Sequence, residues 1–598
     1  MPASGTLLRA LCLLGCFAAL ALPAGAAAQD LDSLAVPADT TGRDSAAAYL
    51  RRQAEARVRV PVMPRFAAEG PQPPASRLVF PRDSIDWSGA ATVSDLLARV
   101  PGVYLWRGGG IGRPEPANYR GRGAASVEYL LDGLPYLALG PDSIAVDPAL
   151  FPLGLLDRIE VERWPGQLRV HLYTRRHDRL AAGSEILLGA GPHKLATYRG
   201  TLERRFASGF GFGGGAEYLE VPPTGTRGHY QNTQYWAQLS YVPSASFGVQ
   251  VQYLGATPDR DAFSDGTALG ERHEGRRGEL QARLFLGGRP GGTGPRLDAI
   301  YARSAFDSAG IDQTVAQVGG AASVRGATWA LRASALHRTR WTPLDASASA
   351  SWAPIGPFTL AAEGVYRRHD GSRTARWLGG RAGLGLPGGL SLSGSVRSGD
   401  DVPAPALLAS AVQELSEMEG TAAWSRGWIS AEASYARTKS FAPPGYQPFA
   451  GIPGIAPSGL TDWLTLGGHL APLGWFSVRG WYADSRNGEA EGIPPDHYFA
   501  TATIRSKFLR RFPSGALDLK LELGVEGWRA GVLGRDPGGA PVALPAARYL
   551  RSLVQLQLES FSLFWESRNL TDESVGYVPG FRVPRYNGYF GLRWGFSN

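Results

Sequence analysis

Cysteine is almost missing from this chain. Among 598 residues only Cys12 and Cys16 are cysteines, and both fall inside residues 1–28, which have the composition of a secretory signal peptide. We expect the mature chain to begin at Gln29 and to contain no cysteine. Disulfides and thiolate metal sites are then excluded from the mature protein.

The signal-peptide prediction depends on three features in order. Arg9 precedes an apolar run, Ala10–Leu22, and Ala26–Ala28 supplies the small residues of a cleavage site. Leu13–Cys16 is also similar to a lipoprotein box. The apolar run continues well past that box, which favours ordinary secretion.

Long apolar runs are scarce after the signal peptide. No second run of about 18 apolar residues follows, so no transmembrane helix is expected. An exported chain without such a helix can span a membrane only as a closed β-barrel, because lipid cannot satisfy the hydrogen bonds of an open strand edge. Charge is modest too, with 19% charged residues and a net charge of +8. Since the arginines are scattered rather than clustered, no nucleic-acid partner is expected.

From about residue 183 to 598 apolar and polar residues alternate with a period of two. In Leu517–Glu526 the leucines face one way and the charged residues face the other, and Phe247–Tyr253 behaves alike. About 22 such segments, many with Trp or Tyr near an end, predict a 22-stranded antiparallel transmembrane β-barrel. A soluble β-sandwich also alternates, but it rarely repeats so many long strands. Long connections follow odd-numbered strands and short turns follow even-numbered ones, as in barrels with both chain ends on one side.

Two regions of different character precede the barrel. Residues 29–75 are polar and rich in Ala and Pro, which is typical of a flexible N-terminal extension. Residues 76–180 mix helical and strand patterns and predict a compact α/β domain. Because a barrel of residues 183–598 is too wide to be filled by its own side chains, its lumen must hold water or a plug.

Three short motifs follow one another in the α/β segment: a helix ending in Pro-Gly, an Arg-Gly before a strand that ends in Asp-Gly, and Ile-Glu-Val before an arginine. They occupy Leu97–Val103, Arg120 and Gly121, Leu130–Gly133, and Ile159–Val161 with Arg163. This order resembles the plug domain of TonB-dependent outer-membrane receptors. The residues that carry the plug motif here are Pro101, Gly102, Gly121, Asp132, Gly133 and Glu160.

The resemblance implies a role for two of the motif arginines. In the family, plug arginines of these motifs pair with glutamates of the barrel wall, so Arg120 and Arg163 are expected to tether the plug. An arginine guanidinium can bind a carboxylate through two parallel hydrogen bonds. This geometry suits a partly buried ion pair that holds the plug to the barrel wall. The candidate partners are Glu432, Glu522 and Glu559. The alternative is that both arginines only satisfy loops within the plug.

Two departures from the family pattern bear on energy coupling. The Trp164–Gly166 turn passes almost directly into the next strand, so the plug is expected to be shortened and its lumen looser. The family's N-terminal TonB box is not clear, and the best candidate for TonB contact by strand addition is Val58, Val60 and Val62. A linker that happens to contain valines is the alternative.

Aromatic residues in predicted outer loops are candidates for ligand contact. They are Tyr446, Phe449, Trp463, Tyr577 and Phe581. Aromatic faces suit a sugar, a porphyrin-like ring or a catecholate, whereas an interfacial aromatic girdle is the alternative. The sequence has neither a His-Glu-x-x-His nor a Gly-x-Ser-x-Gly motif. We therefore expect no catalytic residues, no metal site and no cofactor.

The sequence thus predicts a membrane all-β protein with an N-terminal α/β plug in the barrel lumen. The resemblance implies a receptor in the Gram-negative outer membrane that takes up a scarce siderophore, cobalamin, glycan or metal complex. Its expected partners are a TonB-type energy-coupling protein, outer-membrane lipid with lipopolysaccharide, and the ligand, and the chain is expected to be monomeric. One alternative is a plugged barrel without active transport, namely a passive porin or structural protein. The other is a secreted soluble β-protein that binds carbohydrate.

Overall fold

The structure is a computed structural model, and it describes only part of the chain. The described residues are 54, 58–66, 70–140, 144–222, 229–260, 273–289, 291–354, 356–439, 441–443, 454–487, 490–579, 581–584 and 587–597. The expected signal peptide and the ligand candidates Tyr446 and Phe449 lie outside them. Within the described residues, no helix has the length and apolar character needed to cross a bilayer.

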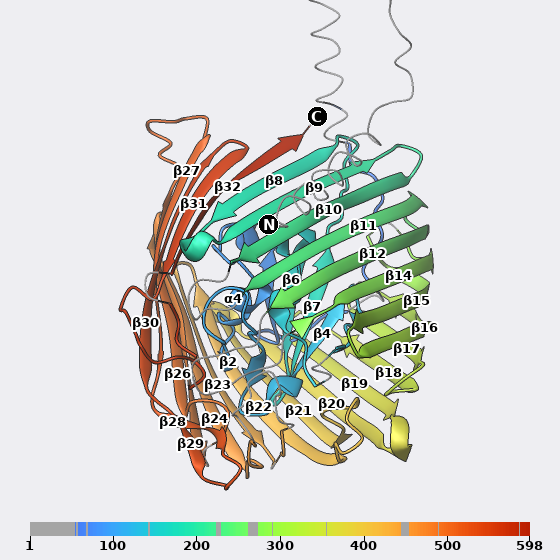
Figure 1. Cartoon of the computed structure of the whole chain (residues 1–598). Coiled ribbons are helices and arrows are strands. Elements are labelled where there is room, and N and C mark those ends of the chain that lie inside the picture. Colours follow the sequence, from blue (N-terminus) through green and yellow to red (C-terminus); the bar gives the residue numbers. More distant parts are fainter. Residues whose placement is uncertain are drawn as a thin grey trace, which may run out of the picture.

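The second part of the described chain forms a closed antiparallel barrel in which β32 pairs with β8 (Figure 1). Twenty-two strands make up the wall, and the two-residue β13 only extends the edge of β12. The strands are β8 (Gly183–Ala190), β9 (Ala196–Arg205), β10 (Phe210–Val221), β11 (Tyr230–Ser244), β12 (Phe247–Arg260), β13 (His273–Glu274), β14 (Arg276–Gly287), β15 (Gly294–Ser308), β16 (Ile311–Arg325), β17 (Trp329–Arg338), β18 (Leu344–Trp352), β19 (Phe358–Arg368), β20 (Thr374–Gly385), β21 (Leu390–Asp401), β22 (Gln413–Arg426), β23 (Ile429–Thr438), β24 (Thr461–Leu473), β25 (Phe476–Asn487), β26 (Asp496–Ser506), β27 (Leu517–Trp528), β30 (Ala547–Leu558), β31 (Phe561–Arg568) and β32 (Asn587–Ser597).

The alternating sequence produces a two-faced wall. On β27, Leu521 and Leu523 are 39% and 64% exposed on the outer face, whereas Lys520 and Glu522 are buried on the lumen face. Successive side chains of a strand point to opposite faces, so a period of two separates a lipid-facing from a lumen-facing set. The predicted barrel and its strand number are confirmed.

The barrel has two unlike rims. At the terminal rim, where β8 begins and β32 ends, most connections are short, such as the two residues between Ser244 and Phe247. At the opposite, loop rim, the connections are longer, and one of them contains a hairpin of β28 (Gly531–Arg535) and β29 (Pro541–Leu544). Most long connections follow odd-numbered barrel strands, as the sequence predicted. The ten-residue connection after β26 and the two-residue connection after β15 depart from this pattern.

A small α/β domain lies inside the barrel (Figure 1). Its sheet has the order β1-β6-β7-β4-β5, with β4 and β7 parallel. Its elements are β1 (Arg77–Pro81), α3 (Arg82–Asp86), α4 (Val93–Leu97), β2 (Val103–Leu105), β3 (Ala117–Tyr119), η1 (Ala124–Ser126), β4 (Val127–Leu131), β5 (Leu134–Pro135), η2 (Pro148–Leu150), η3 (Leu153–Leu155), β6 (Leu156–Arg163) and β7 (Leu168–Thr174). Short helical turns also occur in the barrel part, at η4 (Pro192–Lys194), η5 (Asp370–Ser372) and η6 (Pro387–Gly389).

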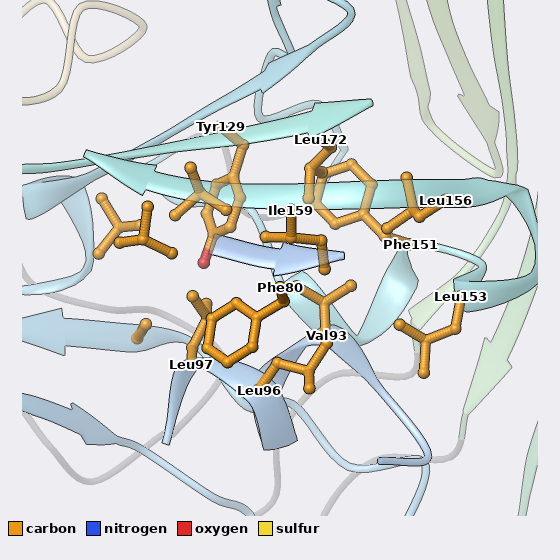
Figure 2. Close-up of a cluster of buried hydrophobic side chains, with 14 of the residues drawn as sticks. Phe80, Val93, Leu96, Leu97, Tyr129, Phe151, Leu153, Leu156, Ile159 and Leu172 are labelled. Carbon is orange, nitrogen blue, oxygen red and sulfur yellow. The ribbon is translucent and has the colours of Figure 1, made fainter. Parts of the chain in front are cut away.

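The plug core packs α4 against its sheet (Figure 2). Thr92 and Asp95 form a reciprocal capping box that starts α4. Leu96 and Leu97 then lie fully buried against Ile159 of β6. The helix is therefore set by its cap and its apolar face, as the spacing predicted.

The short β6–β7 connection packs against the barrel wall through Trp164. Trp164 donates its backbone N–H to the Gln167 carbonyl across 2.9 Å, which closes a tight hairpin. The Trp164 ring is buried, and the Arg381 guanidinium of β20 lies 3.6 Å from its centroid. The indole therefore packs against the barrel wall, and it also lines a cavity of about 80 Å³ beside the hairpin. The looser lumen stays a prediction.

Candidate functional site: plug anchors, lumen cavities and the aromatic cluster

Arg120 makes a buried, two-point link between plug and barrel. Its Nη2 and Nη1 donate to the two carboxylate oxygens of Glu419 on β22 across 2.8 and 3.2 Å. Nη1 also donates to the Pro165 carbonyl across 2.8 Å. Burial alone would lower the pKa of Arg120, but the nearby Glu419 carboxylate raises it, so the guanidinium stays charged.

The sequence reasoning missed Glu419 as the partner of Arg120. Glu432, Glu522 and Glu559 were the candidates, and Glu419 was not among them. The signal was present in β22, where Glu417 and Glu419 are two residues apart and thus both face the lumen.

The three proposed glutamates occupy different positions. Glu432 of β23 lies 2.6 Å from Nη2 of Arg163. Glu522 lies 3.5 Å from a different plug arginine, Arg99. Glu559 lies in the turn after β30, and among the described residues it forms no ion pair with Arg120 or Arg163.

The wall formed by β19–β22 carries further ion pairs to the plug. We call these the ionic face. Its contacts are Arg122 with Glu417 (2.6 Å), Arg169 with Glu363 (2.8 Å), Glu128 with Arg367 (2.8 Å) and Glu162 with Arg381 (2.6 Å). Burial would raise the pKa of Glu162, but Arg381 and Arg77 outweigh it and lower that pKa well below its usual range.

Two cavities border the ionic face. An outer cavity of about 170 Å³ opens toward the loop rim and is lined by Glu128, Arg340, Arg367 and His369, among others. An inner cavity of about 80 Å³ lies beside Arg169 and Glu363.

A chain of charges separates these two cavities. Arg169 contacts Glu363 at 2.8 Å and Glu128 at 3.4 Å, and Glu128 in turn contacts Arg367 at 2.8 Å. We call these four residues the partition. Each of these contacts is an ion pair, and the Arg169 guanidinium also lies 5.3 Å from the centroid of the buried Trp377 ring.

The plug meets another part of the wall, formed by β26, β27 and β30, through an aromatic cluster of Tyr104, His497, Trp528, Tyr549 and Tyr577. The Tyr104 ring lies edge-on to Trp528, with centroids 5.3 Å apart, and Tyr549 stacks on Tyr577 at 5.1 Å. The Tyr104 hydroxyl donates to the Tyr577 carbonyl across 2.7 Å. This contact joins the plug directly to the loop between β31 and β32.

The predicted ligand aromatics that the structure describes are not open to solvent. Trp463, Tyr577 and Phe581 are 2%, 5% and 8% exposed, and all three belong to the cluster of buried side chains around Tyr104. Sequence placed them in loops, where exposure is the usual expectation. The loop between β31 and β32 instead folds back over the plug and buries Tyr577 and Phe581, whereas Trp463 lies on strand β24 and not in a loop.

Asp95 connects helix α4 to the same loop. Its carboxylate accepts from the Ala91 N–H at 2.9 Å and contacts Arg568, at the end of β31, at 2.7 Å. Arg107 lies 3.1 Å away. Burial would raise the pKa of Asp95, but Arg568 and Arg107 outweigh it and hold that pKa well below its usual range.

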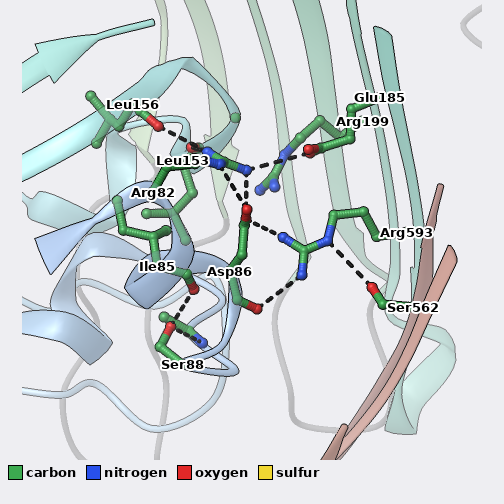
Figure 3. A network of polar contacts seen from close by, with 12 residues as sticks. Arg82, Ile85, Asp86, Ser88, Leu153, Leu156, Glu185, Arg199, Ser562 and Arg593 are labelled. Atoms are coloured by element: carbon green, nitrogen blue, oxygen red, sulfur yellow. Dashed lines mark hydrogen bonds and ion pairs between the residues drawn. The ribbon is translucent and has the colours of Figure 1, made fainter. Parts of the chain in front are cut away.

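A third set of contacts ties α3 to the barrel seam (Figure 3). Arg82 donates to the Leu153 and Leu156 carbonyls at 2.9 and 2.8 Å and lies 3.4 Å from Glu185 of β8. Asp86 forms an ion pair with Arg593 of β32. Plug contacts therefore reach both strands that close the barrel.

The motif glycines occupy turns that require them. Asp132 and Gly133 have φ angles of 49° and 91° in the turn between β4 and β5, the conformation of a tight hairpin. Gly121 has φ 72°, and a Cβ there would lie 2.3 Å from Ala490. Gly102 has φ 81° where the chain leaves α4 after Pro101.

The segment with Val58, Val60 and Val62 lies at the terminal rim in an extended form. Val60 donates its N–H to the Asp178 carbonyl across 2.8 Å, next to an isolated bridge between residues 59 and 179. Just after it, Arg65 lies 2.6 Å from Glu160 of the plug motif. The segment is thus connected to the plug sheet through a charged contact.

These observations define a class of protein: a transmembrane β-barrel whose lumen is closed by a folded plug. Residues 72–170 match the family model described as TonB-dependent Receptor Plug Domain. The chain therefore has the plug and barrel of a TonB-dependent outer-membrane receptor.

Known proteins agree with this architecture. The vitamin B12 transporter BtuB of Vibrio vulnificus is 26% identical over 189 residues, which are 29% of this chain and 30% of that protein. The match thus spans under a third of that relative's length. A mutant of the ferric enterobactin receptor PfeA from Pseudomonas aeruginosa has a TM-score of 0.67 at 12% identity, covering 88% of this chain and 99% of that one. The copper transporter OprC has a TM-score of 0.67 at 11% identity, covering 90% and 100%. At these identities the structural likeness establishes the fold.

Proposed function

We propose that the protein is a TonB-dependent receptor and transporter, not an enzyme, that takes up a small molecule or metal complex across the outer membrane. The observation that carries the proposal is a connected set of contacts from the N-terminal segment to the plug and on to the wall. Arg65 joins the segment to Glu160, and Arg120 and Arg163 join the plug to Glu419 and Glu432. A pull on the segment is therefore transmitted to the anchors of the plug.

The ligand route follows the ionic face. A solute that enters the outer cavity meets the partition, and the inner cavity lies beyond it on the same wall. The route is expected along the partition because water can solvate its charged groups as they separate, whereas a displaced ring of the aromatic cluster would leave a void. The siderophore, vitamin and copper carried by the relatives named above are the first ligands to screen.

The remaining partners follow from the same architecture. A TonB-type protein adds a strand to Val58–Val62 once Val60 leaves the Asp178 carbonyl. Lipid and lipopolysaccharide surround the barrel, which acts as a monomer.

Cysteine crosslinking tests the TonB contact. The mature chain is expected to have no cysteine, so Val60→Cys introduces one thiol at the terminal rim. We expect it to form a disulfide with a cysteine placed in the purified TonB C-terminal domain. Ser514→Cys, an exposed position at the same rim, is the control and should not react. Equal crosslinking at both positions contradicts strand addition.

Uptake measurements test energy coupling. Cells that express the protein are given a labelled ferric catecholate, cobalamin, a copper chelate and an oligosaccharide in turn. A protonophore should abolish uptake of the preferred solute, and so should Val60→Pro, which removes a strand-pairing N–H. Uptake that survives both treatments supports the passive porin instead.

A further inference from the structure

One connection at the terminal rim is longer than the rest. Between the end of β26 at Ser506 and the start of β27 at Leu517 lie ten residues. The next longest connection at this rim, between Gly287 and Gly294, has six. Barrels of this class keep turns at this rim short, and two residues join strands elsewhere in this one. The extra length is therefore not needed to close the hairpin.

The extended turn combines exposed apolar and exposed cationic side chains. Phe508, Leu509 and Phe512 are 43%, 58% and 43% exposed. Lys507, Arg510 and Arg511, which are interleaved with them, are also exposed. In the part of the chain that the structure describes, none of these three cations forms an ion pair.

The turn holds its shape through its own backbone. The N–H groups of Arg511 and Phe512 donate to the Phe508 carbonyl across 2.8 and 2.9 Å, and Phe508 has φ 47°. The Ala516 carbonyl accepts from the N–H of Glu559 in the neighbouring turn across 2.9 Å. The apolar and cationic groups are thus presented from a fixed loop.

The turn continues the lipid-facing band of the barrel. Ile504 and Leu558, near the ends of β26 and β30, are 42% and 45% exposed, and Trp475 in the next turn is 49% exposed. Phe476 pairs with Ile504, and Leu517 pairs with Leu558, so these residues share one level of the wall. Exposed aromatic residues at a strand end mark the edge of the hydrocarbon layer.

We infer that Lys507–Phe512 binds the headgroup of an anionic phospholipid in the leaflet at the terminal rim. Phe508, Leu509 and Phe512 enter the acyl boundary, and the three cations bind phosphate oxygens. Aromatic and aliphatic groups next to lysine and arginine are the composition of interfacial lipid-binding segments, and each cation near an anionic surface adds to the attraction. The inference depends only on the barrel spanning a membrane and goes beyond uptake.

Native mass spectrometry of the whole protein in detergent tests this binding. The probes are phosphatidylglycerol, which is anionic, and phosphatidylcholine, which is zwitterionic. We expect wild-type protein to retain phosphatidylglycerol, and the triple variant Lys507→Gln, Arg510→Gln, Arg511→Gln to bind it about a hundred-fold more weakly. A second variant, Phe508→Ser with Phe512→Ser, should weaken both lipids.

A matched variant removes the same charge elsewhere at the same rim. Arg289, Arg325 and Arg426 are exposed at other turns of the terminal rim, and their triple glutamine variant should bind phosphatidylglycerol as the wild type does. Heat-modifiable migration on a gel verifies that each barrel is folded.

Equal phosphatidylglycerol binding by the wild type and the Lys507 triple variant overturns the inference. So does an equal loss in the Arg289 triple variant, because net charge rather than the turn then decides. Salt-sensitive capture of an acidic periplasmic protein by the turn, with no lipid difference, overturns it in favour of a protein partner.

Discussion

The plug is held in the barrel by two unlike surfaces. On the ionic face, arginine–carboxylate pairs such as Arg169 with Glu363 leave two cavities between plug and wall. In the aromatic cluster, Tyr104 packs edge-on against Trp528 and is fully buried. Apolar packing resists sliding because a displaced ring leaves a void. Charged groups can exchange their partners for water, so we expect the ionic face to be the side that moves.

The largest expected effect is the loss of the Arg120 anchor on the ionic face. Arg120→Ala leaves Glu419 buried without a counter-charge, and we expect a loss of about 3–5 kcal/mol in the free energy of unfolding. Urea titration in detergent micelles measures it. The double variant with Glu419→Ala should recover part of the loss, because the uncompensated charge is then gone.

A surface pair provides the control for the Arg120 anchor. Lys439 and Glu414 form an ion pair with side chains 43% and 65% exposed. Lys439→Ala should cost less than about 1 kcal/mol. If it matches Arg120→Ala, burial does not set the strength of the anchors.

A smaller effect is expected in the aromatic cluster. Tyr104→Phe keeps the ring contacts but leaves the Tyr577 carbonyl without its donor, which should cost about 1–2 kcal/mol. The same urea titration measures it, and ion conductance in a planar bilayer should stay at the wild-type level. A rise in conductance would contradict the view that this side remains closed.

The smallest effect on stability, with the clearest effect on conductance, is expected at the partition. Glu128→Ala leaves Arg169 paired with Glu363 and Arg367 paired with Asp345. Since neither arginine loses its last carboxylate, we expect a loss of about 1 kcal/mol, the net value of a typical hydrogen bond. Single-channel conductance in potassium chloride should nevertheless rise, because a charged group between the two cavities is removed. Glu414→Ala at the loop rim is the control. Wild-type conductance in Glu128→Ala would place the route elsewhere.

The barrel was predictable because the alternation of apolar and polar residues that defines each strand acts over only a few residues. Alternation along Leu517–Glu526 separates the two faces of β27 whatever the rest of the chain does. The plug was predictable from short motifs whose glycines serve local turns, such as Asp132 and Gly133. The ten-residue turn after β26 was not predicted, since nothing local requires that length.

The barrel residues that contact the plug arginines were harder to predict than the plug arginines themselves. Arg120 was identified from its motif, but Glu419 lies 299 residues away and was not selected among the lumen-facing glutamates. Tyr577 and Phe581 were expected to meet a ligand, yet the loop that carries them is packed against the plug. Loop direction depends on contacts with distant elements, which no window of sequence contains.

The sequence by itself determined the two-faced strands, the closed barrel and the plug motifs, because strand periodicity and turn chemistry act over a few residues. Only the tertiary structure decided which carboxylate meets each arginine and which rings pack between plug and wall. Those outcomes depend on strand register and on how the plug is rotated inside the barrel. Both are set by the sum of many long-range contacts.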